Sequence, residues 1–206
     1  MTAMTRRSAL QFGLMCLAAP AALAQEAKAA PDWRSKLVKA AREQIGVTTL
    51  YDPTYVRLGY PGGDVAPDRG VCTDVIVRAY RRAFALDLQK LVHEDMVANF
   101  AAYPKTWGLK ATDRNIDHRR VGNLAAFFSR HGVSLPVSQD PADFQPGDIV
   151  AQMLPGNLPH IVIVSSGRST DVPEQALVIH NIGAGAREED TLFAFRQTGH
   201  YRFAPA

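Results

Sequence analysis

Three side chains in this sequence could together perform nucleophilic catalysis: Cys72, His160 and His180. Cys72 lies at the predicted start of a helix, in GVCTDVIVRAYRR, where the helix dipole and a nearby imidazolium favour a thiolate. His160 opens the apolar run HIVIV and His180 lies in LVIHNIGAG, so the two histidines fall on consecutive predicted strands. His160 would pair with the thiolate and later protonate a leaving amine, while His180 would fix the tautomer and orientation of His160.

Each of these residues also has a purely structural interpretation. A single cysteine is a common buried residue, and a lone histidine on an apolar strand is more often a core residue than a catalyst. A zinc site could use the same three side chains, but the sequence lacks the closely spaced Cys or His pairs typical of such sites. The joint occurrence of two histidines downstream of Cys72 favours catalysis without a metal or other cofactor.

The beginning of the chain has the layout of a signal peptide. Arg6 and Arg7 precede an apolar run over residues 10–23, and small residues allow cleavage after Ala24. The residues around the arginine pair also resemble a twin-arginine signal, which leaves that route and the general secretory route both open. We therefore expect residues 1–24 to be a signal peptide and the protein to be periplasmic or secreted.

Removal of the signal peptide changes the charge and the cysteine content. The full chain of 206 residues has 23 basic and 20 acidic residues, and cleavage removes two arginines and no acid, which leaves 21 and 20. This balance, without a long Lys/Arg run, gives no electrostatic basis for binding nucleic acid. Cleavage also removes Cys16, so Cys72 has no disulfide partner within the chain.

The mature chain is predicted to be one domain, residues 25–206, without an integral membrane segment. Its length suits a single core, and no segment after the signal peptide approaches the roughly 20 apolar residues that span a bilayer. Helical spacing of apolar residues predicts helices over residues 31–45, 73–84, 88–101 and 121–131. A loop rich in Gly, Pro and Asp is predicted over residues 50–70.

The second half of the chain is predicted to form the strands. Short runs rich in Val, Ile and aromatic residues indicate strands over residues 149–153, 160–165, 176–181 and 200–203, with 193–196 as part of one more. Helices followed by strands are typical of an α+β domain with an antiparallel sheet. If the strands of His160 and His180 are antiparallel neighbours, the two imidazoles lie side by side. On the helix that starts at Thr73, we expect Arg78, Arg81 and Arg82 to face solvent.

The order of these motifs resembles the NlpC-type papain-like cysteine peptidases of bacterial cell walls. A cysteine-led helix, PGDIV, HIVIV and a strand ending in VIH follow one another over residues 51–183, as the corresponding motifs do in that family. GVCTDV, NIDHRRVGNL and HNIGAG look like an uncharacterised exported branch of it, a domain of unknown function. The resemblance implies a papain-like fold, with Cys72 as nucleophile at a helix N-terminus packed on the sheet, His160 as general base and His180 as third polar residue.

The resemblance also implies which residues meet the substrate. Tyr55 or Tyr60 matches the tyrosine that precedes the nucleophile and lines the site. Val71 stands where the family has an acid, and Thr73 and Asp74 stand where it has Ser-Gly. In better-known members those polar groups hold the free amine of a wall peptide, so Thr73 and Asp74 are candidate substrate-binding residues with an altered arrangement.

Two arginines in NIDHRRVGNL are further candidates. Arg119 and Arg120 could form a wall of the site that binds peptide carboxylates or the phosphates of a lipid-linked precursor. The alternative is a helix start with Asp117 as N-cap and both arginines solvated.

The leading hypothesis is an exported thiol hydrolase. It would cleave an amide or peptide bond, most plausibly in peptidoglycan peptides, through an acyl-enzyme on Cys72. The alternatives are an acyltransferase or deacylase acting on a lipid-linked substrate, and a non-enzymatic envelope-binding protein that keeps the fold.

Overall fold

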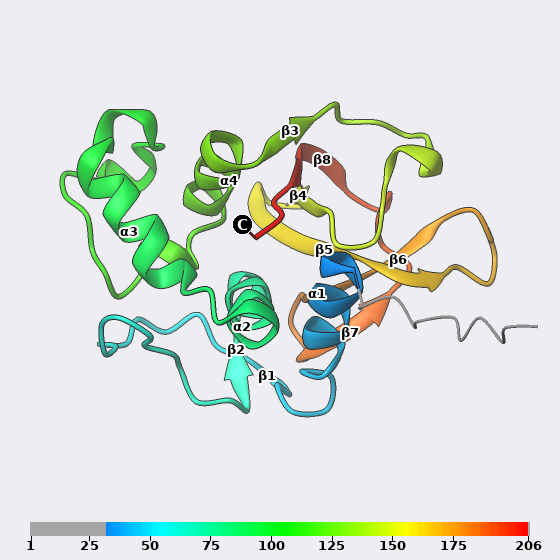
Figure 1. Ribbon diagram of the computed structural model, residues 1–206, viewed down its shortest axis with the longest axis horizontal. Coiled ribbons are helices and arrows are strands. Elements are labelled where there is room, and N and C mark those ends of the chain that lie inside the picture. Colours follow the sequence, from blue (N-terminus) through cyan, green and yellow to red (C-terminus); the bar gives the residue numbers. More distant parts are fainter. Residues whose placement is uncertain (1–31, 206) are drawn as a thin grey trace, which may run out of the picture. The chain divides into compact units, whose positions relative to one another are not determined.

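The computed structural model describes residues 32–205 of the chain (Figure 1), and the predicted signal peptide, residues 1–24, lies outside them. The α-helices of the described part are α1 (Trp33–Arg42), α2 (Cys72–Phe84), α3 (Leu88–Ala98) and α4 (Val121–His131). Its short 3-10 helices are η1 (Phe100–Ala102), η2 (Thr106–Gly108), η3 (Asp117–Arg119) and η4 (Pro141–Asp143). None of the described helices is both long and apolar enough to cross a membrane.

Six strands form one antiparallel sheet in the order β3-β8-β4-β5-β6-β7. They are β3 (Val133–Leu135), β4 (Ile149–Leu154), β5 (Leu158–Arg168), β6 (Ala176–Asn181), β7 (Ala186–Glu189) and β8 (Arg196–Arg202). A separate parallel pair is formed by β1 (Leu50–Tyr51) and β2 (Arg69–Gly70), which close the two ends of the loop over residues 50–70. The α+β class with an antiparallel sheet is therefore confirmed.

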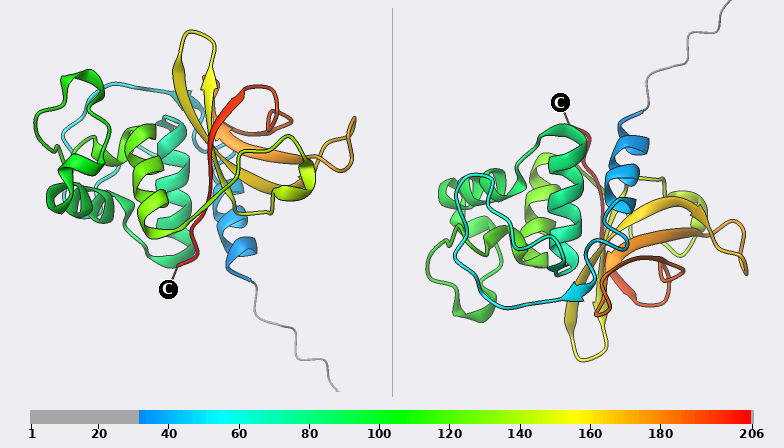
Figure 2. Two further views of the ribbon diagram at one scale, coloured as in Figure 1. Left: turned by 90° about the horizontal axis from the view of Figure 1, so that it is seen from above. Right: turned by 90° about the horizontal axis from the view of Figure 1, so that it is seen from below.

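The two faces of the sheet are covered differently. Ile161 and Ile163 of β5 join the large apolar cluster that contains the helix residues, whereas Val162 and Val164 join a smaller cluster with Phe144 on the opposite face. Figure 2 shows α2, α3 and α4 gathered on one side of the strands. Because successive side chains of a strand point to opposite faces, the continuous apolar run HIVIV supplies both clusters at once.

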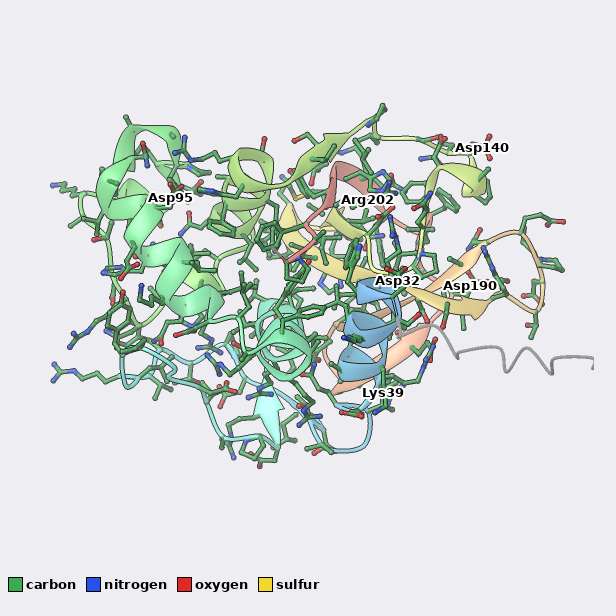
Figure 3. The ribbon with its side chains drawn as sticks, in the orientation of Figure 1. Asp32, Lys39, Asp95, Asp140, Asp190 and Arg202 are labelled. Atoms are coloured by element: carbon green, nitrogen blue, oxygen red, sulfur yellow. The ribbon has the colours of Figure 1, made fainter. Side chains whose placement is uncertain are left out.

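The aspartate of PGDIV joins the two strands beside it. Asp148 is fully buried, and its carboxylate accepts hydrogen bonds from Arg202 at 2.7 and 2.8 Å and from His200 at 2.9 Å. Arg202, labelled in Figure 3, ends β8, while Asp148 immediately precedes β4. This buried cluster holds the start of β4 against β8 and so fixes the strand that pairs with β5.

Several details of the sequence prediction are wrong. Residues 193 and 194 lie in a turn and Phe195 lies in a bend, so only Arg196 of the extra predicted strand is extended, at the start of β8. The prediction that Arg78 faces solvent fails as well, because its guanidinium pairs with Asp64 at 2.9 and 3.0 Å and donates to three carbonyl groups of the loop. Arg78 thus ties α2 to the loop that leads into it.

Candidate active site

The two predicted histidines meet on neighbouring strands. β5 and β6 pair antiparallel, and His160 Nε2 lies 2.8 Å from His180 Nδ1. Both residues are buried, with exposed fractions of 2% and 0%. The prediction that the two imidazoles lie side by side is confirmed.

A carboxylate on the next strand extends this pair. His180 Nε2 lies 2.9 Å from Oε2 of Glu189, the last residue of β7. The side chain of Glu189 is partly exposed, and its other oxygen lies 3.7 Å from Nη1 of Arg187. Three side chains on three adjacent strands therefore form one hydrogen-bonded chain, which we call the relay: Glu189, His180 and His160.

The sequence reasoning missed Glu189 because it missed β7. The strand AREE is polar and has none of the β-branched or aromatic residues that mark the other strands. It is held by pairing with β6, where Glu189 lies opposite Val178. The available signal was its position, since a short segment directly after the Gly-rich HNIGAG turn commonly returns along the preceding strand as a hairpin.

Burial keeps both histidines of the relay uncharged near neutral pH. Burial, with a smaller contribution from the neighbouring His180, lowers the pKa of His160 to about 3. It also lowers the pKa of His180, against the opposing effect of Glu189. A buried imidazolium is disfavoured because the interior solvates charge poorly.

The nucleophile candidate lies on the helix side of the sheet. Cys72 is the first residue of α2 and is 4% exposed, and the backbone N–H of Ile161 on β5 favours its thiolate. The N–H groups of Cys72 and Thr73 at the helix start also favour the thiolate. Burial outweighs all three and, with the nearby Asp74 carboxylate, raises the pKa of the Cys72 thiol to about 12. The expectation of a thiolate near neutral pH is therefore wrong for this structure, although the helix effect behind it is present.

The thiol and the relay meet β5 at two consecutive residues, Ile161 and His160, but are not hydrogen-bonded to each other. The thiol meets the peptide N–H of Ile161, the residue that follows His160. Within residues 32–205, no hydrogen bond joins the Cys72 thiol to the His160 imidazole. Catalytic hydrogen bonds in free enzymes are often long and tighten only when substrate is bound, so this geometry is compatible with proton transfer between them.

A cavity opens beside the thiol. It has a volume of about 170 Å³, and its walls include Tyr51, Cys72, Ile116, Arg119, Arg120 and Pro159. The site-wall interpretation of the two arginines therefore agrees with their position, and Arg119 is not solvated, since it is only 9% exposed. Asp117 does not cap α4, because it is the first residue of η3 and the helix N-cap is Arg120.

Tyr51 occupies the place beside the nucleophile that the sequence assigned to Tyr55 or Tyr60. The β1–β2 pairing sets Tyr51 opposite Gly70, two residues before Cys72. Partial burial of the half-exposed Tyr51 ring raises the pKa of its hydroxyl, and the proximity of Cys72 adds to this. The hydroxyl of Tyr55 instead bonds Asp113, and that of Tyr60 bonds Glu94. Neither of those two tyrosines is among the described residues that line the cavity.

The predicted substrate-binding residues Thr73 and Asp74 are buried in a structural network. Arg119 donates to both oxygens of Asp74, at 3.0 Å from Nε and 3.0 Å from Nη2, and both side chains are 4% exposed. The Asp74 carboxylate also accepts from the backbone N–H of Val71 at 2.7 Å, and the Thr73 hydroxyl donates to the carbonyl of Arg119 at 3.1 Å. Arg119 further bonds the carbonyl groups of residues 52 and 54, so this network joins three segments around the cavity.

One amide joins the relay strand to the strand pair ahead of the nucleophile. Asn181, the neighbour of His180 at the end of β6, is fully buried. Its side-chain amide donates to the carbonyl groups of Leu50 at 3.3 Å and Gly70 at 3.0 Å. These bonds set the distance between the end of β6 and the residues that lead into Cys72.

Comparison with known proteins finds one family model that covers most of the chain. The family described as "Domain of unknown function (DUF1287)" matches residues 38–203. The chain belongs to the DUF1287 family. An uncharacterized protein of Escherichia coli K12, YijF, is 58% identical to this DUF1287 chain over 167 residues, which are 81% of this chain and 80% of YijF. The family match over residues 38–203 includes α2, the relay strands and the residues that line the cavity, so the candidate site lies wholly inside the DUF1287 region.

Proposed function

We propose that this DUF1287 protein is an exported thiol hydrolase of NlpC-type papain-like architecture, which cleaves an amide or peptide bond through an acyl-enzyme on Cys72. The observation that carries the proposal is the hydrogen-bonded relay. It ends at His160, and the next residue of β5, Ile161, has its backbone N–H beside the Cys72 thiol. A chain of carboxylate and imidazoles beside a thiol is the arrangement used for nucleophilic catalysis.

The chemistry starts from two neutral partners. As the sulfur of Cys72 attacks the carbonyl carbon, its proton moves to His160, and the N–H of Ile161 stabilises the sulfur as it becomes negative. We expect the N–H groups at the start of α2 and the hydroxyl of Tyr51, a residue that lines the cavity, to stabilise the oxyanion. His160 then protonates the leaving amine, and a water molecule activated by His160 hydrolyses the thioester and restores the thiol.

The cavity favours an anionic substrate. Its walls are mainly apolar and include two arginines, and none of the described residues that line it is an Asp or Glu. Asp74, the nearest carboxylate in sequence, is fully engaged with Arg119 and Val71, so it is not free to hold an ammonium group. We propose that Arg120 attracts carboxylates of the substrate, as are found on peptidoglycan peptides.

The test uses purified wall fragments. The mature protein and its Cys72→Ala and Cys72→Ser variants are incubated with peptidoglycan peptides, and products are followed by mass spectrometry. We expect the variants to lose at least about 10³-fold in turnover, because Cys72→Ala removes the nucleophile and Cys72→Ser replaces the thiol by a much less acidic hydroxyl. Thermal unfolding of the three proteins controls for folding, and Cys72→Ser preserves the size of the side chain.

The possible products separate the hypotheses. Products identical with and without Cys72 would reject the hydrolase. Transfer of an acyl group to an acceptor other than water would identify an acyltransferase, and binding of wall fragments without any turnover would identify an envelope-binding protein. A mass increase on Cys72 equal to the acyl part of the substrate would directly demonstrate the acyl-enzyme.

A further inference from the structure

The relay contains a residue to which the proposed chemistry has so far given no role. Glu189 touches neither the thiol nor the cavity, and of the two histidines it contacts only His180. It is nevertheless the only member of the relay whose hydrogen-bonding direction is fixed, because a carboxylate can accept but cannot donate.

Because Glu189 can only accept, it determines which ring nitrogen carries the proton in His180 and, through His180, in His160. His180 Nε2 must carry a proton to donate to Glu189, so the neutral ring of His180 has a lone pair on Nδ1. That lone pair accepts the proton on His160 Nε2. The neutral ring of His160 then has its own lone pair on Nδ1, which has no hydrogen-bond partner among residues 32–205.

We propose that Glu189 is a positioning residue that orders the protons of His180 and His160 and thereby leaves His160 Nδ1 as the free base. The opposite order would place a proton on His160 Nδ1, and the ring could then not accept the thiol proton. The ordering of the tautomers does not depend on the proposed function, whereas its effect on turnover rests on that function.

The exposure of Glu189 sets the expected size of the effect. Its side chain is 32% exposed, so in a Glu189→Ala variant water can also accept from His180 Nε2. Removal of the carboxylate therefore weakens the preference for one order and mixes the two tautomers. Loss of a buried carboxylate that orients a catalytic histidine lowers kcat about 10⁴-fold. Loss of a hydrogen-bond partner of a metal-binding histidine lowers activity only about 10- to 100-fold, and we expect this lower range for Glu189.

The first measurement is independent of activity. Long-range ¹H–¹⁵N correlation spectra of protein with ¹⁵N-labelled histidines report which ring nitrogen carries each proton. In the wild type we expect both rings as Nε2–H, and in Glu189→Ala we expect both tautomers for His180 and His160. His180 found as Nδ1–H in the wild type, or unchanged spectra in Glu189→Ala, would overturn the proposal.

The second measurement is kinetic and uses a matched control. Glu189→Ala should lower kcat about 10- to 100-fold with little change in KM, because Glu189 does not line the cavity. Glu189→Gln should recover part of the rate, since its amide oxygen can still accept from His180. Glu188→Gln is the control, because Glu188 is the preceding residue of β7 but pairs with Arg42 and Ser165 instead of a histidine.

The two measurements separate two kinds of failure. If the wild type cleaves no wall fragment, the proposed function fails while the spectra still decide the order of the tautomers. If the wild type is active and Glu189→Ala has the same kcat, or if Glu188→Gln loses as much as Glu189→Ala, the positioning role fails and the hydrolase stands.

Discussion

Two regions of the candidate site stabilise their buried polar groups differently. The sheet side contains the relay, and the helix side contains the start of α2 with Asp74 and Arg119. On the sheet, the two rings of the relay are neutral, and the hydrogen bonds that run from the Glu189 carboxylate order their protons. At the start of α2, Asp74 and Arg119 are both charged and both buried, and each neutralises the other. The two imidazoles and the thiol that could perform chemistry are thus uncharged, whereas the charged Asp74–Arg119 pair beside them is structural.

This difference explains why the resting thiol is protonated. The helix start supplies N–H groups that favour a thiolate, but the same close packing that orders them removes water from the sulfur. Asp74 adds a negative charge nearby, although Arg119 compensates for it. Under the proposed function, the thiol would therefore transfer its proton during the attack, because no thiolate–imidazolium ion pair is present beforehand.

The largest effect is expected on the helix side, from breaking the buried ion pair. Asp74→Asn leaves Arg119 charged and without its carboxylate, and the loss of one partner of a buried pair costs about 3–5 kcal/mol of the free energy of unfolding. Urea unfolding monitored by circular dichroism measures the loss. Arg119→Met should cost a similar amount, and the double variant Asp74→Asn/Arg119→Met should cost less than the sum.

The control for this prediction is a pair at the surface. Glu43, the residue after α1, pairs at the surface with Lys39 and Arg82, and the three side chains are 42%, 79% and 51% exposed. Glu43→Gln should hardly change the unfolding midpoint, because exposed ion pairs are screened by solvent. Equal losses for Asp74→Asn and Glu43→Gln would mean that the helix side is not held by its buried charges.

The sequence predicted the regular elements well where apolar spacing decides them. α4 and β6 have the predicted bounds, and β4 and β5 differ only at their ends. The pairing of His160 with His180 followed from two apolar runs separated by a short connection, which form neighbouring antiparallel strands. Such local patterns are visible in the sequence because burial of alternate or helically spaced side chains creates them.

The parts that were missed depend on contacts between distant segments. Tyr51 reaches the cavity only because two residues of a loop pair with Arg69 and Gly70, and nothing in their composition indicates a strand. Asp74 pairs with a residue 45 positions away, so its role could not be derived from its place after the cysteine. The pKa of Cys72 was predicted in the wrong direction because burial, unlike a helix start, is a property of the whole fold.

The second-largest expected effect is on how the free energy of unfolding depends on pH, which differs between the sheet side and the helix side. The pKa of His160 falls from 6.5 in the unfolded chain to about 3, so its contribution to stability is complete above pH 6.5 and is lost as the pH falls towards 3. The pKa of the Cys72 thiol rises from 9.0 to about 12, so its contribution is complete below pH 9.0 and is lost as the pH rises towards 12. Acid therefore destabilises the sheet side, and alkali destabilises the helix side.

Urea unfolding from pH 4.5 to pH 10.5 tests this assignment. A single such group changes the free energy of unfolding by at most about 1.4 kcal/mol per pH unit. His160→Gln should flatten the acidic limb and leave the alkaline limb unchanged, while Cys72→Ser should do the reverse. If either variant altered both limbs equally, the two sides would form one electrostatic unit.

The smallest effect separates a structural hydroxyl from one that faces the cavity. Thr73 is fully buried and donates to the carbonyl of Arg119, so Thr73→Val removes one internal hydrogen bond with little change in volume. We expect a loss of about 1 kcal/mol in the free energy of unfolding and an unchanged kcat/KM. Tyr51→Phe should show the opposite pattern, because Tyr51 lines the cavity and is 41% exposed. A raised KM in Thr73→Val at unchanged stability would instead assign Thr73 to substrate binding, and the helix start would then hold substrate as well as structure.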